Sequence, residues 1–372
     1  MTSETTAPIT AHLRCPRTGH PLHEVEGEAF ERARQDVSAP GVTFEDGTSV
    51  PSGVERLFQS DGGEHLYVQA DSILYLTEGK ALDPEVTGGP LAVAPKPRWS
   101  EAKRSVQNFY DETGWKKEDG TYIDTKLFSE VSDVASQYKT RVMDRVTRRL
   151  GTGTFLLNVA SGTVPSGPDT SYAQGFERHV CMDLSLTALQ EARSNLGDRG
   201  VYILGDITNI PLQEGSMDGC VSLHTIYHVP KEEQARAFRE LYRVLKPGGT
   251  AAVVYNWGRH AVLPNLLTLP IQIARYVHKR VMPKERDGQP TLRTLYFHAH
   301  GPSWFEQQDW PFDYEVEAFH SPNNQFLNLY ARDNAVGRRI LQAVYDLEER
   351  YPQTMGKLGY YPLIVIRKAL ST

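Results

Sequence analysis

The stretch that most constrains the fold lies between residues 155 and 255, where short apolar runs alternate with polar, helix-forming segments. The runs cover residues 155–160, 180–183, 201–206, 219–224 and 250–255, and residues 245–249 are expected to close a helix before the last run. Strands that alternate with helices are typical of a mostly parallel sheet with helices on both faces. The pattern therefore predicts an α/β, doubly wound fold.

A polar or glycine residue follows each of the first four runs. Gly162 comes after the first, Asp183 ends the second 21 residues later, Asp206 ends the third and His224 ends the fourth. Ligands of doubly wound sheets bind beyond the carboxyl ends of the strands. A glycine allows close approach of the backbone, and a carboxylate at the second strand can accept both hydroxyls of a ribose. These residues predict a ligand that contains a nucleoside.

This arrangement resembles the class I S-adenosylmethionine-dependent methyltransferases. Residues 206–218 resemble the segment between the third and fourth strands of that family, and residues 241–249 resemble the segment before its fifth strand. The resemblance implies a Rossmann-like, seven-stranded sheet whose last strand, at residues 361–367, is antiparallel. It also implies S-adenosyl-L-methionine as the cofactor, held by Asn158, Ala160, Ser161, Gly162, Asp183, Leu184, Asp206, Ile207 and His224.

The glycine-rich turn of the family is reduced in this chain. The first strand of the family usually ends in an acid and continues as Gly-x-Gly-x-Gly, whereas this chain has Asn158 followed by Ala160, Gly162 and Val164 at the glycine positions. A dehydrogenase needs several glycines at a helix N-terminus to bind a pyrophosphate. S-adenosylmethionine has no phosphate, so a single glycine favours a methyltransferase over a dehydrogenase.

Candidate catalytic groups lie in residues 223–228. His224 is expected to face the methyl group, with Tyr227 and His228 at the rim, because an imidazole can remove a proton from an acceptor near neutral pH. The alternative is that His224 only packs against the cofactor. The candidate acceptor-binding residues are Tyr110, Trp115, Tyr122, Tyr296 and His298. The first three could instead belong to the core, and Tyr296 and His298 could be solvated or pack against a helix.

Four segments are expected along the chain. Residues 1–85 should form a small β-rich domain that ends in a hairpin at residues 66–76, and residues 86–100 a linker rich in proline and glycine. Residues 101–150 should form a helical lid, and residues 151–372 the cofactor-binding domain. Within the last, residues 256–335 are expected to be an insertion that contains an amphipathic helix at residues 263–281.

The first segment resembles the zinc-ribbon-like domains of the Trm112 type at residues 13–22. Cys15 is present, but Thr18 occupies the position of the second cysteine, and no second cysteine pair follows. His20 and His23 do not complete a standard four-ligand zinc set. The sequence therefore predicts that this segment binds no metal.

Net charge and cysteine content limit the binding partners and the cellular compartment that are expected for this chain. The net charge of −6 argues against nucleic acid, and the three scattered cysteines argue against a disulfide framework. No apolar run reaches the roughly 18 residues needed to span a bilayer, and no signal peptide is visible, so a cytoplasmic protein without a membrane partner is expected. The preferred function is methyl transfer to a small molecule. The alternatives are a tRNA or protein methyltransferase, and a Rossmann-like protein that has become a lyase, an isomerase or a scaffold.

Overall fold

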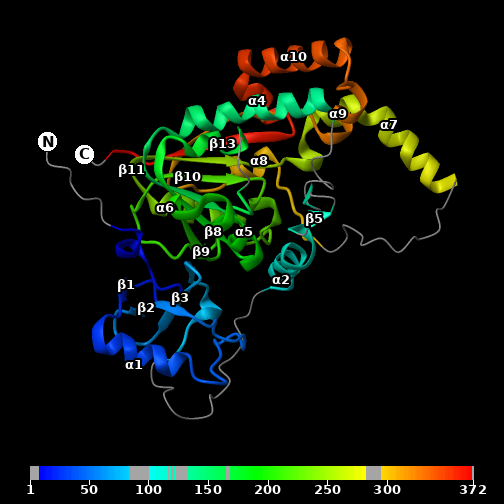
Figure 1. Cartoon of the computed structure of the whole chain (residues 1–372). Coiled ribbons are helices and arrows are strands. Elements are labelled where there is room, and N and C mark those ends of the chain that lie inside the picture. Colours follow the sequence, from blue (N-terminus) through cyan, green and yellow to red (C-terminus); the bar gives the residue numbers. More distant parts are fainter. Residues whose placement is uncertain are drawn as a thin grey trace.

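The structure is a computed structural model, and it describes residues 8–83, 100–115, 117–118, 121–122, 132–164, 168–281 and 295–370. One twisted sheet with helices on both faces forms the centre of the molecule (Figure 1). The predicted α/β, doubly wound class is confirmed.

Five central strands are parallel, as the apolar runs predicted. They are β7 (Gly153–Val159), β8 (Phe176–Asp183), β9 (Gly200–Leu204), β10 (Met217–Leu223) and β11 (Leu245–Val254), and their order across the sheet is β9-β8-β7-β10-β11. Next to β11, β13 (Tyr361–Arg367) is antiparallel, and β12 (Asp313–His320) pairs antiparallel with β13. The predicted seven-stranded core with an antiparallel last strand is therefore confirmed. The strand order reverses between β7 and β10, which is where ligands of such sheets bind.

The N-terminal segment continues the same sheet. Its strands are β1 (Leu22–Glu24), β2 (Val54–Ser60), β3 (Leu66–Ala70) and β4 (Ile73–Tyr75), with helix α1 (Gly27–Val37) beside them. The pairing of β3 with β4 confirms the predicted hairpin at residues 66–76. The last of these strands, β4, pairs in parallel with β9, so the sheet has eleven strands among the described residues and the edge of β9 is covered.

Side chains alternate between the two faces of the central strands, as the pleat requires. Leu156 and Val221 belong to a core cluster that includes residues of α4 (Asp133–Leu150) and α10 (Ala335–Arg350). Leu157 and Cys220 belong to a cluster on the opposite face with residues of α6 (Gln234–Val244). Helix α5 (Leu186–Leu196) packs over β8 and β9. The central strands are buried on both faces, which explains their nearly continuous apolar sequences.

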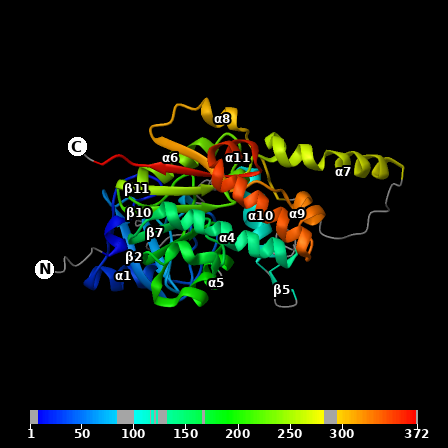
Figure 2. The same ribbon diagram turned by 90° about the horizontal axis from the view of Figure 1, so that it is seen from above.

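A buried ion pair joins α4 to α10, which lie side by side in Figures 1 and 2. Arg145 Nη1 lies 2.9 Å from Glu348 Oε2, and the exposed fractions of the two side chains are 6% and 0%. The hydroxyl of Tyr138 and the backbone N–H of Ser321 donate to the same carboxylate. Helix α4, which was predicted to be part of a lid, therefore belongs to the core.

Two predicted boundaries differ from the structure. Residues 245–249 were expected to close a helix, but α6 ends at Val244 and β11 begins at Leu245. Residues 256–335 were expected to be an insertion, yet they contain the edge strand β12 beside α7 (Val262–Val281), α8 (Pro302–Glu306) and α9 (Asn324–Tyr330). Helix α11 (Pro352–Leu358) then leads into β13. The predicted linker lies, apart from Ser100, outside the described residues.

Helix α2 (Glu101–Phe109) and a π-helical turn at Tyr110–Gly114 lie over the carboxyl ends of β8 and β9, and a two-stranded ribbon, β5 (Lys117–Glu118) and β6 (Thr121–Tyr122), follows them. In the part of the chain that the structure describes, no helix is long and apolar enough to cross a bilayer. The same residues contain no group of three or more side chains placed to hold a metal ion.

Candidate functional site

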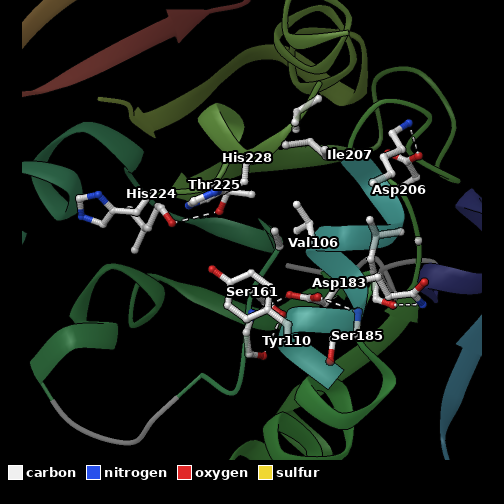
Figure 3. Close-up of a pocket in the computed structure, with 18 of the residues that line it drawn as sticks. Val106, Tyr110, Ser161, Asp183, Ser185, Asp206, Ile207, His224, Thr225 and His228 are labelled. Atoms are coloured by element: carbon white, nitrogen blue, oxygen red, sulfur yellow. Dashed lines mark hydrogen bonds and ion pairs between the residues drawn. The ribbon is translucent and has the colours of Figure 1, made fainter. Parts of the chain in front are cut away.

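A cavity of about 220 Å³ lies at the carboxyl ends of β7, β8, β9 and β10, beneath α2. Its walls come from the loop after β7, the ends of β8 and β9, and the turn after β10 (Figure 3). A water molecule needs only about 10–15 Å³ of such volume, so this space suits a small organic ligand. The predicted residues Ala160, Ser161, Gly162, Asp183, Leu184, Asp206, Ile207, His224, His228, Tyr110 and Trp115 all line the cavity.

The loop after β7 keeps a left-handed backbone at each position where the family has glycine. The φ angles are +51° at Ala160, +59° at Gly162 and +43° at Val164. This conformation costs residues with a Cβ roughly 1–2 kcal/mol each, and it is rarest for β-branched side chains. The left-handed turn is therefore present even though two of these three positions carry a Cβ.

Asp183 is held at the floor of the cavity by two backbone amides. The N–H of Gly162 donates to Oδ2 at 2.9 Å, and the N–H of Ser185 donates to Oδ1 at 2.8 Å. Burial raises the pKa of Asp183 to about 6, although these amide hydrogen bonds act in the opposite direction. Each oxygen keeps a second acceptor position, so the carboxylate can still receive two hydroxyl groups.

The turn that follows α2 places two aromatic rings over the loop. Tyr110 and Trp115 stack with their centroids 5.3 Å apart. A Cβ added to Gly162 would lie 2.8 Å from the Trp115 ring, closer than packed carbon atoms approach. Both residues were predicted to bind the acceptor, and the structure places them against the glycine loop. Tyr122 lies in β6, and its side chain is outside the described residues.

Asp206 is already paired in this structure. Lys103 of α2 donates to Asp206 Oδ2 at 2.8 Å and to Glu233 Oε2 at 2.5 Å, while the N–H of Thr208 donates to Asp206 Oδ1 at 2.8 Å. Burial acts to lower the pKa of Lys103, but the two carboxylates outweigh it and the pKa is raised. Ile207, which is largely buried, adds an apolar wall beside this cluster. Sequence reasoning missed Lys103, because nothing in its helix signals a partner 103 residues away.

His224 lies at the end of β10 in a left-handed conformation, with φ of +60°. Its ring makes edge contacts with Tyr361, at 4.8 Å between centroids, and with Phe319, at 5.7 Å. Figure 3 shows the ring directed away from Asp183 and Asp206. Burial lowers the pKa of His224 to about 3, with a smaller effect from nearby Lys139. The imidazole is therefore neutral and packed among aromatic rings.

His228 has a defined tautomer. Its Nδ1 lies 2.7 Å from the carbonyl oxygen of Tyr296, and a carbonyl can only accept, so Nδ1 carries the proton and Nε2 is left as an acceptor. Burial lowers the pKa of His228 to about 4. Figure 3 places His228 beside Thr225 on the side of the cavity that faces Asp183. Nε2 is therefore the nitrogen of His228 that can accept a proton.

Four further predicted residues lie behind the cavity wall rather than on it. The hydroxyl of Tyr296 accepts from the N–H of Lys231, and the N–H of His298 donates to the carbonyl of Tyr227 at 2.8 Å. These contacts hold the turn that carries His228. Asn158 is buried within β7 and donates from its amide to the hydroxyl of Tyr172 at 3.0 Å.

Comparison with known proteins agrees with this geometry. Residues 157–253 match the model of a family described as a methyltransferase domain. The chain is 27% identical over 174 residues to the biotin biosynthesis bifunctional protein BioHC of Teredinibacter turnerae, covering 42% of this chain and 27% of that protein. It is 37% identical over 99 residues to the ubiquinone/menaquinone biosynthesis C-methyltransferase UbiE of Methylobacterium nodulans, covering 25% of this chain and 38% of that protein.

Among solved structures, the geranyl diphosphate C-methyltransferase of Streptomyces coelicolor A3(2) aligns over 74% of this chain and all of its own length, with 13% identity and a TM-score of 0.45. The chain covers only about a quarter to two fifths of the length of the two curated relatives. The part of this chain that matches the methyltransferase-domain model is the segment around β7 to β11.

Proposed function

We propose that this chain, whose residues 157–253 belong to the class I S-adenosylmethionine-dependent methyltransferase domain, transfers a methyl group to a small, partly apolar acceptor. The observation that carries the proposal is the Asp183 carboxylate, which lines the cavity and is fixed by the backbone amides of Gly162 and Ser185 below the glycine loop. A ribose diol presents the two donors that this arrangement requires.

The remaining cavity residues suit the other parts of the cofactor. Leu184 and Ile207 offer apolar walls for the adenine, and Asp206 offers a carboxylate near its amino group. Ser161 and Gly162 would lie along the methionine portion, under the rings of Tyr110 and Trp115. Leu184, Ile207, Asp206, Ser161 and Gly162 all belong to the cofactor-binding set predicted from the sequence. Asn158 also belongs to that set, but it bonds to Tyr172 and does not line the cavity.

Bound S-adenosylmethionine supplies an electrophilic methyl group, and the protein aligns the acceptor with it. His228 is the proposed proton acceptor, because its Nδ1–H is fixed on the Tyr296 carbonyl and its Nε2 is free to accept. Burial lowers the pKa of His228 to about 4, so its imidazole is neutral at pH 7 and can accept a proton. His224, which packs against Phe319 and Tyr361, is proposed to shape the part of the cavity wall beyond His228.

The lining of the cavity and the names of the relatives support an apolar class of acceptor. Leu223, Val229, Tyr110 and Trp115 make the methyl-side wall largely apolar. The names of the relatives include ubiquinone/menaquinone biosynthesis and sterol 24-C-methyltransferase, the latter from Saccharomyces cerevisiae at 38% identity over 63 residues. Both names point to apolar acceptors, and the negative net charge of the chain disfavours a nucleic acid.

Calorimetry with S-adenosylmethionine tests the cofactor, and methyl-labelled S-adenosylmethionine with fractionated small-molecule extracts tests the transfer. His228→Asn should lower turnover about 10²-fold or more with unchanged cofactor affinity, as for loss of a general base. His224→Asn is the matched control and should keep most of the turnover. If the cofactor does not bind, the function is wrong. If His224→Asn is the inactive variant, the two histidines exchange roles.

A further inference from the structure

Helix α7 (Val262–Val281) extends away from the body of the molecule in both ribbon views (Figures 1 and 2). Seven of its large apolar side chains have exposed fractions between 44% and 64%: Val262, Leu266, Leu267, Leu269, Ile273, Tyr276 and Val277. Exposed apolar residues that occur singly need no explanation, but a contiguous group of this kind marks an interaction surface.

The helix presents an apolar stripe outward, while polar and apolar side chains share its inward side. Val262, Leu266, Leu269, Ile273 and Tyr276 follow one another at intervals of four, three, four and three residues, so they form one stripe. On the inward side, Thr268 is fully buried and donates to the carbonyl of Pro264 at 2.7 Å. Gln272 donates to Thr268, and Asn265 donates to the carbonyl of Gly258. An ordinary surface helix has the opposite orientation, so this stripe is built to meet something outside the domain.

The charges of α7 indicate what that partner is. Residues 262–281 contain no aspartate or glutamate, and Arg275, His278, Lys279 and Arg280 gather toward the C-terminal end, in a chain whose net charge is −6. A second copy of α7 would bring no acidic residue to these cations in either orientation. An anionic lipid surface supplies both an apolar layer for the stripe and negative charge for the basic end.

We propose that α7 docks on an anionic lipid surface, with its apolar stripe in the headgroup region. Tyr276 lies in the stripe next to the basic end of the helix. Amphipathic aromatic side chains favour the headgroup region of a bilayer. A helix in the plane of the interface needs no spanning run, so the docking agrees with the absence of a membrane-spanning helix among the described residues. The sequence-based prediction of no membrane partner considered only segments long enough to span a bilayer.

Docking would bring the cavity near the lipid. Helix α7 follows β11 by a short turn at residues 255–261, at the same edge of the sheet as the cavity, because the carboxyl ends of parallel strands share one edge. An apolar acceptor dissolved in the bilayer could then reach the cavity over a short path. The lipid docking itself does not depend on methyl transfer.

Co-sedimentation with vesicles tests the proposal, using phosphatidylcholine alone and phosphatidylcholine mixed with phosphatidylglycerol. The full chain should bind the mixed vesicles at least tenfold more tightly than the neutral ones. L266E/I273E should lose this binding, and K279E/R280E should lose the preference for anionic lipid. Val336→Glu on α10 is the matched control, since Val336 is as exposed, at 64%, and should bind like the parent.

Absence of vesicle binding by the parent chain would overturn the proposal, as would equal binding by L266E/I273E or an equal loss in Val336→Glu. Sedimentation velocity without lipid adds a further decisive outcome. A dimer that L266E/I273E abolishes, in a chain that ignores vesicles, would assign the stripe to a second copy. Melting curves and S-adenosylmethionine affinity of each variant should match the parent, which separates a failure of this proposal from a failure of the proposed function.

Discussion

Replacing Asp183 by alanine should weaken S-adenosylmethionine binding about 100-fold. Each oxygen of the carboxylate accepts one backbone amide and keeps one acceptor position for a ribose hydroxyl. A hydrogen bond to a charged group contributes roughly 1.5–3 kcal/mol, so two such bonds at the lower figure give about 3 kcal/mol. Each factor of ten in affinity corresponds to about 1.4 kcal/mol.

Isothermal titration calorimetry measures this loss directly. Asp36→Ala, on the exposed face of α1, is the control and should bind like the parent. An Asp183→Ala variant that is folded by circular dichroism and binds within threefold of the parent would refute the assignment of the ribose site. The same outcome would remove the main support for the proposed function.

The pH dependence gives a second test of Asp183. Burial raises the pKa of Asp183 to about 6 from an ordinary 3.8, so the folded protein binds a proton more tightly than the unfolded chain between these values. The stability that this carboxyl contributes is therefore complete below pH 4 and is lost as the pH rises through about 6. The stability of the ligand-free parent relative to Asp183→Ala should therefore fall by about 1–3 kcal/mol as the pH rises from 4 to 7.5. Cofactor affinity in the parent should fall below pH 6, where protonation removes the acceptor, and a flat affinity between pH 5 and 8 would contradict this.

Three further substitutions test the packing around the cavity. Gly162→Ala should weaken cofactor binding at least tenfold, because the new Cβ would clash with Trp115 at 2.8 Å and would sit in a left-handed backbone; calorimetry measures it. Lys103→Met should leave two carboxylates unpaired and release α2, which hydrogen exchange would detect as faster exchange at residues 101–109. Arg145→Met should destabilise the fold by about 3–5 kcal/mol in urea titrations, because Glu348 would remain buried without its cation. Exchange or stability equal to the parent would contradict the latter two.

The elements around the cavity were readable from local sequence. Buried parallel strands require continuous apolar runs, and turns at their carboxyl ends carry polar residues, so the positions of Gly162, Asp183 and Asp206 followed from spacing alone. The antiparallel strand at residues 361–367 followed from the family resemblance.

The N-terminal segment shows the limit of this reasoning. Its hairpin was predicted, but its parallel pairing with β9 was not, because β4 and β9 lie far apart in the sequence and either strand could pair elsewhere. Strand pairing depends on which edges meet after folding, and hydrophobic pattern alone does not encode it.

For the residues of the candidate site, too, the sequence predicts some features and the folded structure decides others. Sequence by itself determined which residues stand at the carboxyl edge of the sheet, because period and turn chemistry are local properties. Tertiary structure alone decided that Lys103 pairs with Asp206, that His228 rather than His224 has an oriented ring, and that α7 turns its apolar stripe outward. Each of these depends on contacts between distant segments, and the rotamer and pairing of a side chain are chosen by neighbours that only the folded chain brings together.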